Sequence, residues 1–241
     1  MVAANVLGTI GTVLWCIQLI PQIWYNWRRK KTDGFPQLMM LLWASCAVPM
    51  GAYLILQNVN IPLQVQPQIF GVFSLISWGQ ILYYNQNAIL SAIGLCVLFG
   101  GIEAMLILTL RIPYSKGITW PDLVVGVVAA VLLASGLIPP YFELWKRDGR
   151  VIGISELVRA LLKCGEVTRL MNAAAEGSFD ILGGIMYIIV VVLEGGIYVS
   201  HIVWRIRYRH VRQEAKTRGR SVDELLAERN QPGDVERGEK E

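Results

Sequence analysis

Residues 34–102 read GFPQLMMLLWASCAVPMGAYLILQNVNIPLQVQPQIFGVFSLISWGQILYYNQNAILSAIGLCVLFGGI. This stretch of 69 residues contains no Asp, Glu, Lys or Arg. A soluble domain carries charged side chains every few residues, whereas a helix that spans about 30 Å of hydrocarbon needs about 20 mostly apolar residues. The stretch therefore predicts several membrane-spanning helices in succession.

The residues before this stretch are equally apolar. Residues 1–27 contain no charged side chain, and the whole chain is 54% hydrophobic with a mean hydropathy of +0.46. A cleaved signal peptide would have a basic start, a shorter apolar part and a small-residue cleavage site, and this segment has none of these. We therefore expect residues 1–27 to contain a retained transmembrane helix.

Polar and turn-forming clusters divide the apolar sequence into spans. The clusters are 28–34, 57–62, 85–87, 111–116 and 145–150. They predict helices near residues 2–24, 36–57, 63–84, 88–110, 120–142 and 179–204, with a seventh crossing expected in the charged segment 152–175. The predicted fold is an all-α polytopic membrane protein of seven transmembrane helices.

Loop charge predicts the orientation, because short loops rich in Lys and Arg stay on the cytoplasmic side. The basic run 28–31, the loop 146–150 and the seven Lys and Arg of residues 205–220 lie on one side only if the segment 152–175 crosses. The N-terminus is then lumenal or outside, and the C-terminus is cytosolic.

An internal repeat relates the two halves of the chain. At an offset of 118 residues, Leu19-Ile20-Pro21 aligns with Leu137-Ile138-Pro139, and Trp27 aligns with Trp145. At an offset of 112 residues, Gln68 aligns with Asp180. Two parallel units with three helices each need one extra crossing between them. We therefore divide the chain into a first unit (1–87), a linker helix and loop (88–117), a second unit (118–204) and a tail (205–241).

At these residues the chain resembles the PQ-loop repeat family, whose fold is similar to that of SWEET transporters. The resemblance covers residues 5–204 and includes Pro21-Gln22, Pro139-Pro140 and the run 67–71, Pro-Gln-Ile-Phe-Gly. The second motif has Pro140 where the family usually has Gln. The resemblance implies a transporter, since the family includes cystinosin-like proteins and vacuolar or lysosomal cationic amino-acid transporters.

The two prolines have a physical consequence inside a helix. Pro21 and Pro139 lack the N–H donor and displace the carbonyl four residues earlier, of Ile17 and Ser135. Such sites can be paired hinges for alternating access, as the resemblance implies, or static kinks. The repeat favours hinges over kinks.

Polar residues inside the predicted spans are candidates for the transport path and for proton coupling. Carboxyls in hydrocarbon are costly and usually face a bundle interior. The path candidates are Gln68, Gln80, Tyr83, Asp180 and Tyr187, and the coupling candidates are Glu194 and Asp180. Four of these residues have a structural alternative: a hydrogen-bonded structural acid for Glu194, a helix start for Asp180, and interfacial anchors for Tyr83 and Tyr187. Glu103 is a weaker candidate.

The segment 152–175 does not resemble an ordinary transmembrane helix. Its charges at Glu156, Arg159, Lys163, Glu166 and Arg169 recur every three or four residues and share one helix face. Three explanations stay open: a crossing helix with paired charges, a helix on the membrane surface, or a stretch altered relative to the apolar sixth helix of the family.

The remaining features exclude several functions. The four cysteines lie in predicted spans without CxxC spacing, the two histidines lie at and beyond the last span, and the sequence shows no catalytic constellation. We expect no enzyme activity, metal, cofactor or nucleic-acid partner.

We expect a basic, then acidic, disordered tail. The expected partners are the lipid bilayer, a small solute such as an amino acid, and a proton; the oligomeric state stays open. The leading hypothesis is a vacuolar or lysosomal amino-acid transporter, and the alternative is a lipid-translocating or non-transporting protein of membrane trafficking.

Overall fold

All secondary structure that the computed structural model describes is helical. It describes residues 9–10, 13, 17, 19–32, 35–59, 61–86, 89–146, 181–220 and 222–230. The segment 152–175 and most of the predicted span 2–24 lie outside these ranges. The helices are α2 (Ile20–Arg29), α3 (Gln37–Leu56), α4 (Ile61–Gln86), α5 (Ile89–Ser115), α6 (Trp120–Gly136), α7 (Ile138–Lys146), α9 (Ile181–Arg207), α10 (Arg209–Arg218) and α11 (Val222–Asn230).

Four of the described helical stretches are long and apolar enough to span a membrane. They are Gln37–Leu56, Leu90–Ser115, Trp120–Lys146 and Ile188–Arg207. Helix α4 has 26 residues, but Gln64, Gln66, Gln68 and Gln80 make it less apolar than the other long helices. The predicted class of a helical, multi-pass membrane protein is therefore supported by helix length and composition.

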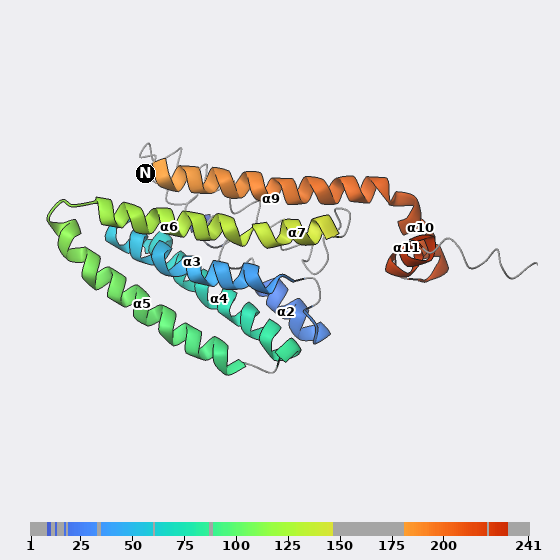
Figure 1. Cartoon of the computed structure of the whole chain (residues 1–241), viewed down its shortest axis with the longest axis horizontal. Coiled ribbons are helices and arrows are strands. Elements are labelled where there is room, and N and C mark those ends of the chain that lie inside the picture. The colour runs from blue at the N-terminus through green and yellow to red at the C-terminus, as the bar shows by residue number, and fades with distance from the viewer. Residues whose placement is uncertain are drawn as a thin grey trace, which may run out of the picture.

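Helix α3 is the centre of the bundle (Figure 1). It packs against α4, α5, α6 and α7, and most of its residues are buried. Trp43 of α3 contacts Phe70 of α4, with 5.4 Å between ring centroids. On its other side, Trp43 lies against Gly136 at the end of α6, where an added Cβ would meet the indole at 2.3 Å. A glycine at this position lets α6 approach the core closely.

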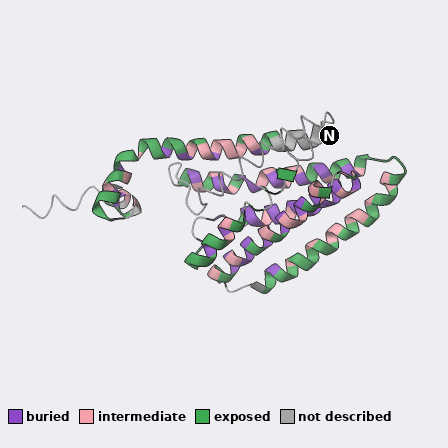
Figure 2. Cartoon of the chain, turned by 180° about the vertical axis from the view of Figure 1, so that it is seen from behind, coloured by how far each residue is buried: buried purple, intermediate pink, exposed green. Residues whose placement is uncertain are grey.

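Helix α5 lies at the periphery of the bundle and exposes a long apolar face (Figure 2). Leu90, Val97, Leu98, Met105 and Leu108 are each more than half exposed. Side chains of this kind suit a lipid environment, because hydrocarbon does not penalise exposed apolar surface.

The predicted end of this helix is wrong. We expected a turn at 111–116, but α5 continues to Ser115. It ends where Gly117 adopts a left-handed φ of 80°, with the Gly117 N–H bonded to the Tyr114 carbonyl and the Ile118 N–H bonded to the Pro113 carbonyl. Glycine is the residue that makes this type of helix end without strain.

The direction of the last long helix is informative. Figure 1 shows that α9 runs in the same direction as α6 and α7, and α9 packs against both of them. The chain therefore starts α9 at the opposite end of the bundle from the end where α7 stops. The described basic residues of α2, α7, α9 and α10 lie toward the end where α7 stops.

The tail differs from the predicted disordered segment over residues 209–230. Helices α10 and α11 pack on each other through Val211, Ala215 and Leu225, which are all buried. The physical reason is that these apolar side chains are spaced to give each short helix one apolar side. Residues 231–241 lie outside the described residues.

Candidate functional site

Each proline motif lies in the first turn of a short helix that follows a turn residue. Leu19 precedes α2 and Leu137 separates α6 from α7, and both are turn residues with buried side chains. The Leu137 N–H bonds to the Ala134 carbonyl at 3.0 Å, which is the tighter pattern of a helix end. Pro139 follows two residues later and has no N–H to offer the Ser135 carbonyl. Pro21 and Pro139 therefore each follow a buried turn leucine at matching places in the two units, and their role as hinges stays a prediction.

The segments that follow the two breaks also match in burial. At the offset of 118 residues, α2 and α7 place buried, half-buried and exposed residues in nearly the same order. The buried pairs differ in chemistry. In α2 they are Gln22 and Asn26, joined by a hydrogen bond of 2.9 Å from the Gln22 amide to Asn26 Oδ1, whereas in α7 they are Pro140 and Leu144.

A side chain ties the first helix to the third helix in each unit, close to the break. In the first unit, the Gln80 amide of α4 donates to the Ile23 carbonyl of α2 at 3.1 Å. In the second unit, the Tyr141 hydroxyl of α7 donates to the Leu193 carbonyl of α9 at 2.5 Å. Ile23 and Tyr141 are equivalent at the offset of 118, so the tie occurs at the same place with donor and acceptor exchanged.

A row of buried polar side chains follows one side of α4. Gln66, Ser74 and Ser77, here called the polar row, are each 0% exposed and align with Phe70 and Ile81 at helical spacing. Among the described residues, the Gln66 amide nitrogen and oxygen and both serine hydroxyls have no hydrogen-bond partner. An unsatisfied buried polar group costs about 1–3 kcal/mol. The row extends about 16 Å along the helix, so it offers polar partners through much of a bilayer.

Sequence reasoning missed the polar row. The signal that could have found it was the spacing of residues 66, 70, 74, 77 and 81, which puts them on one face of a helix. The sequence does not show that this face is turned inward.

Two predicted path residues line a groove between α2, α4 and α5. Gln80 and Tyr83 lie along it together with Trp27, Lys30 and apolar side chains of α4 and α5, and the groove has a volume of about 550 Å³. Gln80 is half-buried, whereas Tyr83 is 52% exposed and packs edge-on against Tyr84. Tyr83 therefore lies on the outer side of α4, whereas the Gln80 amide is directed toward α2.

Gln68 lies elsewhere and contacts an acid that the sequence ranked lower. Its amide donates to the carboxylate of Glu103, and the pair lies over Gly51 of α3, where a Cβ would meet both side chains. Because α5 extends to Ser115, Glu103 is at the middle of that helix and not near its end. The structure therefore brings three helices together at one carboxyl inside the membrane.

A second buried acid lies at the start of α6, and sequence reasoning did not single it out. Asp122, in the first turn of α6, is 1% exposed and accepts a hydrogen bond of 2.7 Å from the Gln57 amide. The Tyr114 hydroxyl approaches the same glutamine at 3.4 Å. An acid just after Thr119-Trp-Pro is a helix-start signal, since acids favour the first turn.

The remaining predicted residues are only partly described. Glu194 is half-buried in α9. Its neighbour Gly196 lies against Tyr141, as expected for a glycine that allows close helix approach, but a Cβ on Gly195 would meet nothing within 4 Å. Only the backbone of Tyr187 is described, and Asp180 lies outside the described residues.

The polar groups described in this interior are amides, hydroxyls and the carboxyls of Glu103, Asp122 and Glu194. Among the described residues, no three His, Cys, Asp or Glu side chains lie close enough to hold a metal ion. Cys46 is buried and Cys96 is exposed, so these two do not share an environment. The described interior therefore offers hydrogen-bond donors and acceptors, and carboxyl groups, between mostly apolar helices.

Comparison with known proteins identifies the family. Residues 3–63 match the model of the PQ loop repeat. The chain is 42% identical over 228 residues to the uncharacterized membrane protein YDR090C of Saccharomyces cerevisiae, covering 92% of this chain and 72% of that protein. It is 33% identical over 209 residues to the uncharacterized protein C2E12.03c of Schizosaccharomyces pombe, covering 85% and 73%. A shorter match, 31% identical over 86 residues and covering 35% and 27%, is to the vacuolar lysine transporter YPQ1 of Saccharomyces cerevisiae. The chain belongs to the PQ-loop repeat family.

Proposed function

We propose that this protein is a secondary transporter of a small polar solute with seven crossings in a 3+1+3 arrangement. The direction of α9 relative to α7 supports this topology. Because both helices run in the same direction, the chain must cross the membrane once between Lys146 and Ile181, which brings the number of crossings to seven. The segment 152–175 is the part of the chain available for that crossing. The gathering of basic residues at one end of the bundle supports a cytosolic C-terminus and a lumenal N-terminus.

The polar row is the observation that carries the proposal. Three buried polar side chains without partners are unfavourable in a static membrane bundle, where each polar group needs a partner. A solute or water that passes along α4 supplies those partners. The first unit therefore provides the chemistry of the path.

The two helix breaks provide the movement. Breaks at Leu19 and Leu137 leave α2 and α7 as short segments that can change their angle to the rest of the bundle. The ties Gln80 to Ile23 and Tyr141 to Leu193 hold both segments against the third helices. Alternating access then consists of releasing one tie in each unit while the prolines act as hinges.

The proposed solute is an amino acid, and in particular a cationic one, moved across a vacuolar or lysosomal membrane. The name of the relative YPQ1, a vacuolar lysine transporter, supports this choice. Glu103 and Glu194 are the carboxyls proposed to exchange a proton with the lumen, and Asp180 is a further candidate from the sequence. Amides and hydroxyls of the polar row suit the α-amino and α-carboxyl groups of any amino acid.

Uptake of radiolabelled amino acids into reconstituted vesicles under an imposed pH gradient tests the proposal. We expect Gln66→Leu to reduce uptake by about ten-fold, the effect of losing a charged-group hydrogen bond of about 1.4 kcal/mol. Gln64→Leu is the matched control, because Gln64 lies on the same helix and already donates to the Val59 carbonyl at 2.5 Å. Equal uptake in Gln66→Leu and the unaltered protein would exclude the path along the polar row.

The hinge mechanism has its own test in the same vesicles. Pro21→Leu and Pro139→Leu restore the N–H donor and straighten the helix at each break. We expect both to slow uptake without preventing insertion of the protein. Unchanged flux in both variants would contradict the hinge mechanism and leave the path untouched.

The groove between α2, α4 and α5 favours the second candidate function, lipid translocation in membrane trafficking. Its wall is mostly apolar and includes the cation of Lys30 and the hydroxyl of Tyr84. Such a groove suits an acyl chain with its headgroup near a cation. Fluorescent lipid in reconstituted liposomes separates the two functions, because lipid movement without solute flux would favour this second candidate.

A further inference from the structure

The chain after the last long helix folds into a helical hairpin with its own small core. Helix α9 ends at Arg207, and the chain turns at Tyr208 into α10. Gly219, with a left-handed φ of 63°, ends α10 and donates its N–H to the Ala215 carbonyl. Because the apolar sides of α10 and α11 are covered by each other, the hairpin has little apolar surface left to insert into a membrane.

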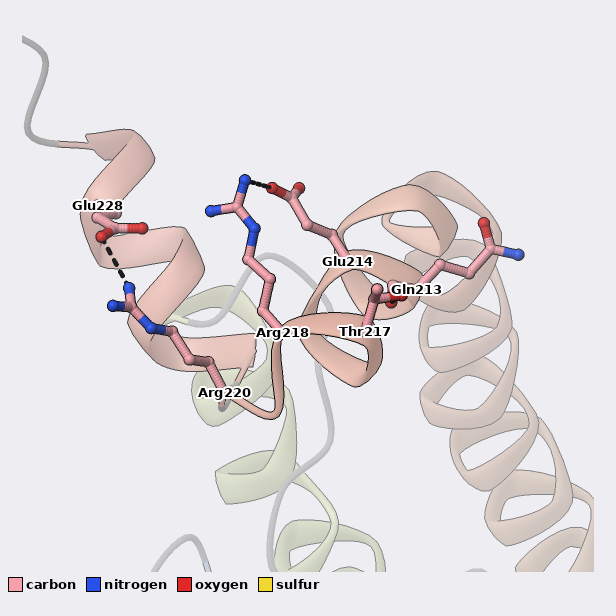
Figure 3. Close-up of polar contacts among 6 residues, drawn as sticks. All are labelled: Gln213, Glu214, Thr217, Arg218, Arg220 and Glu228. Atoms are coloured by element: carbon pink, nitrogen blue, oxygen red, sulfur yellow. Dashed lines mark hydrogen bonds and ion pairs between the residues drawn. The ribbon is translucent and has the colours of Figure 1, made fainter.

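Two of its arginines are neutralised within the hairpin. Arg218 pairs with Glu214 at 2.8 Å, and Arg220 pairs with Glu228 of α11 at 2.9 Å. Figure 3 shows both pairs side by side at the turn between the helices. These two arginines are therefore occupied by acids of the tail itself.

Three other cations have no such acid. Arg209, Arg212 and Lys216, here called the cationic stripe, follow one another at spacings of three and four and so share one helix face. That face lies to one side of the buried Val211 and Ala215, with Arg209 and Lys216 exposed and Arg212 half-buried. Within the part of the chain that the structure describes, none of the three forms an ion pair with Asp or Glu.

The cationic stripe lies where the bilayer surface is expected. The membrane-spanning part of α9 ends at Arg207, only two residues before Arg209. Trp204 and Tyr208 stack with 5.5 Å between their ring centroids, and such aromatic pairs favour the membrane interface. In Figure 1, α10 lies across the end of α9 and does not continue its axis, so the stripe stays near the surface.

We propose that the cationic stripe binds the anionic headgroups of phospholipids in the leaflet where α9 ends. The contact is electrostatic, because the apolar sides of the hairpin are already used. Each Lys or Arg near an anionic surface strengthens binding by about five-fold, so three of them give about a hundred-fold preference for the docked hairpin. Salt weakens the contact, since the charges stay exposed to solvent.

Hydrogen exchange of the full chain in nanodiscs tests this docking. One set of nanodiscs contains only phosphatidylcholine, and the other also contains phosphatidylserine. We expect the α10 amides to exchange up to about a hundred-fold more slowly with phosphatidylserine, and added salt to remove the difference. The combined variant Arg209→Gln, Arg212→Gln and Lys216→Gln should abolish it.

Two variants separate lipid binding from folding of the hairpin. Arg218→Gln with Arg220→Gln removes cations that are already paired and should keep the lipid effect. Arg209→Lys with Arg212→Lys keeps the charge and should also keep it. Exchange in phosphatidylcholine alone reports whether each variant still forms the hairpin.

Three outcomes would overturn the proposal. The first is equal protection in both kinds of nanodisc. The second is protection in phosphatidylcholine alone that is lost when Asp234, Glu236, Glu239 and Glu241 are neutralised, since the acidic end of this chain would then occupy the stripe. The third is protection caused by a soluble inositol phosphate but not by phosphatidylserine. None of these readouts depends on transport, so the proposed function can fail independently.

Discussion

Helices α2 and α7 have the same shape and burial but different interiors. Each starts after a buried leucine at a helix break, has its proline half-buried, and ends in an exposed tryptophan and a cation. In α2 the buried positions hold Gln22 and Asn26, and in α7 they hold Pro140 and Leu144. The backbone geometry of the motif is therefore present twice, while its polar chemistry is present once.

The third helices differ in the same sense. Ser77 and Gln80 of α4 align with Ile189 and Val192 of α9 at the offset of 112, and both of these α9 residues are exposed and apolar. A polar row on the first unit has no counterpart at these positions of the second. The comparison teaches that the repeat preserves the break and the tie, which depend on the backbone, more strictly than the side chains that contact a solute.

The largest effect is expected from a variant of the second unit at the junction between α6 and α7. Gly136→Val places a Cβ within 2.3 Å of the Trp43 indole, which is itself held against Phe70. Overpacking of a well-packed core costs about 3 kcal/mol, because the added side chain forces its neighbours out of their preferred positions. Thermal unfolding of the purified protein in detergent should show a clearly lower midpoint. The control is Gly195→Val in α9, where a Cβ meets nothing within 4 Å, and an equal loss in both would contradict the explanation.

A variant that makes the interior of the first unit resemble that of the second should have an intermediate effect. Gln22→Leu removes the donor to Asn26 Oδ1 and leaves a buried amide oxygen unpaired, at a cost of about 2 kcal/mol. The double variant Gln22→Leu with Asn26→Leu removes both groups, as in α7, and should recover part of the stability. A double-mutant cycle on unfolding in detergent measures this coupling. Additive losses would show that the two side chains act separately.

The smallest effects are expected from variants that remove one of the two ties, and these variants allow the ties to be compared. Tyr141→Phe and Gln80→Leu each remove one hydrogen bond to a carbonyl between helices, and each should cost about 1 kcal/mol. Similar losses would indicate that the ties are equivalent despite their exchanged donors. Tyr83→Phe is the control, because Tyr83 is half exposed on the outer side of α4. A loss from Tyr83→Phe as large as the others would argue against a special role of the ties.

Much of the architecture could be predicted from the sequence, because hydrocarbon excludes charge and a proline inside a helix removes a backbone hydrogen bond. The apolar runs located α3, α4, α5, α6 and α9, and the offset of 118 placed both breaks. The predicted helix ends were less accurate. Helix α5 continues past the predicted end to Ser115, because Gly117 determines where it stops. The hairpin of the tail was missed, because its apolar residues are few and become buried only against each other.

The sequence by itself determined the membrane class, the family and the paired proline motifs, since these depend on composition and local order. Only the tertiary structure decided which polar side chains are buried together. Gln66, Ser74 and Ser77 became a row because α4 turns that face inward, and Glu103 met Gln68 because Gly51 leaves room for both. Such contacts join residues from helices distant in the chain, and their formation depends on how the helices rotate and approach one another. Local sequence does not encode that rotation, which depends on how α4, α5, α6 and α7 pack against α3.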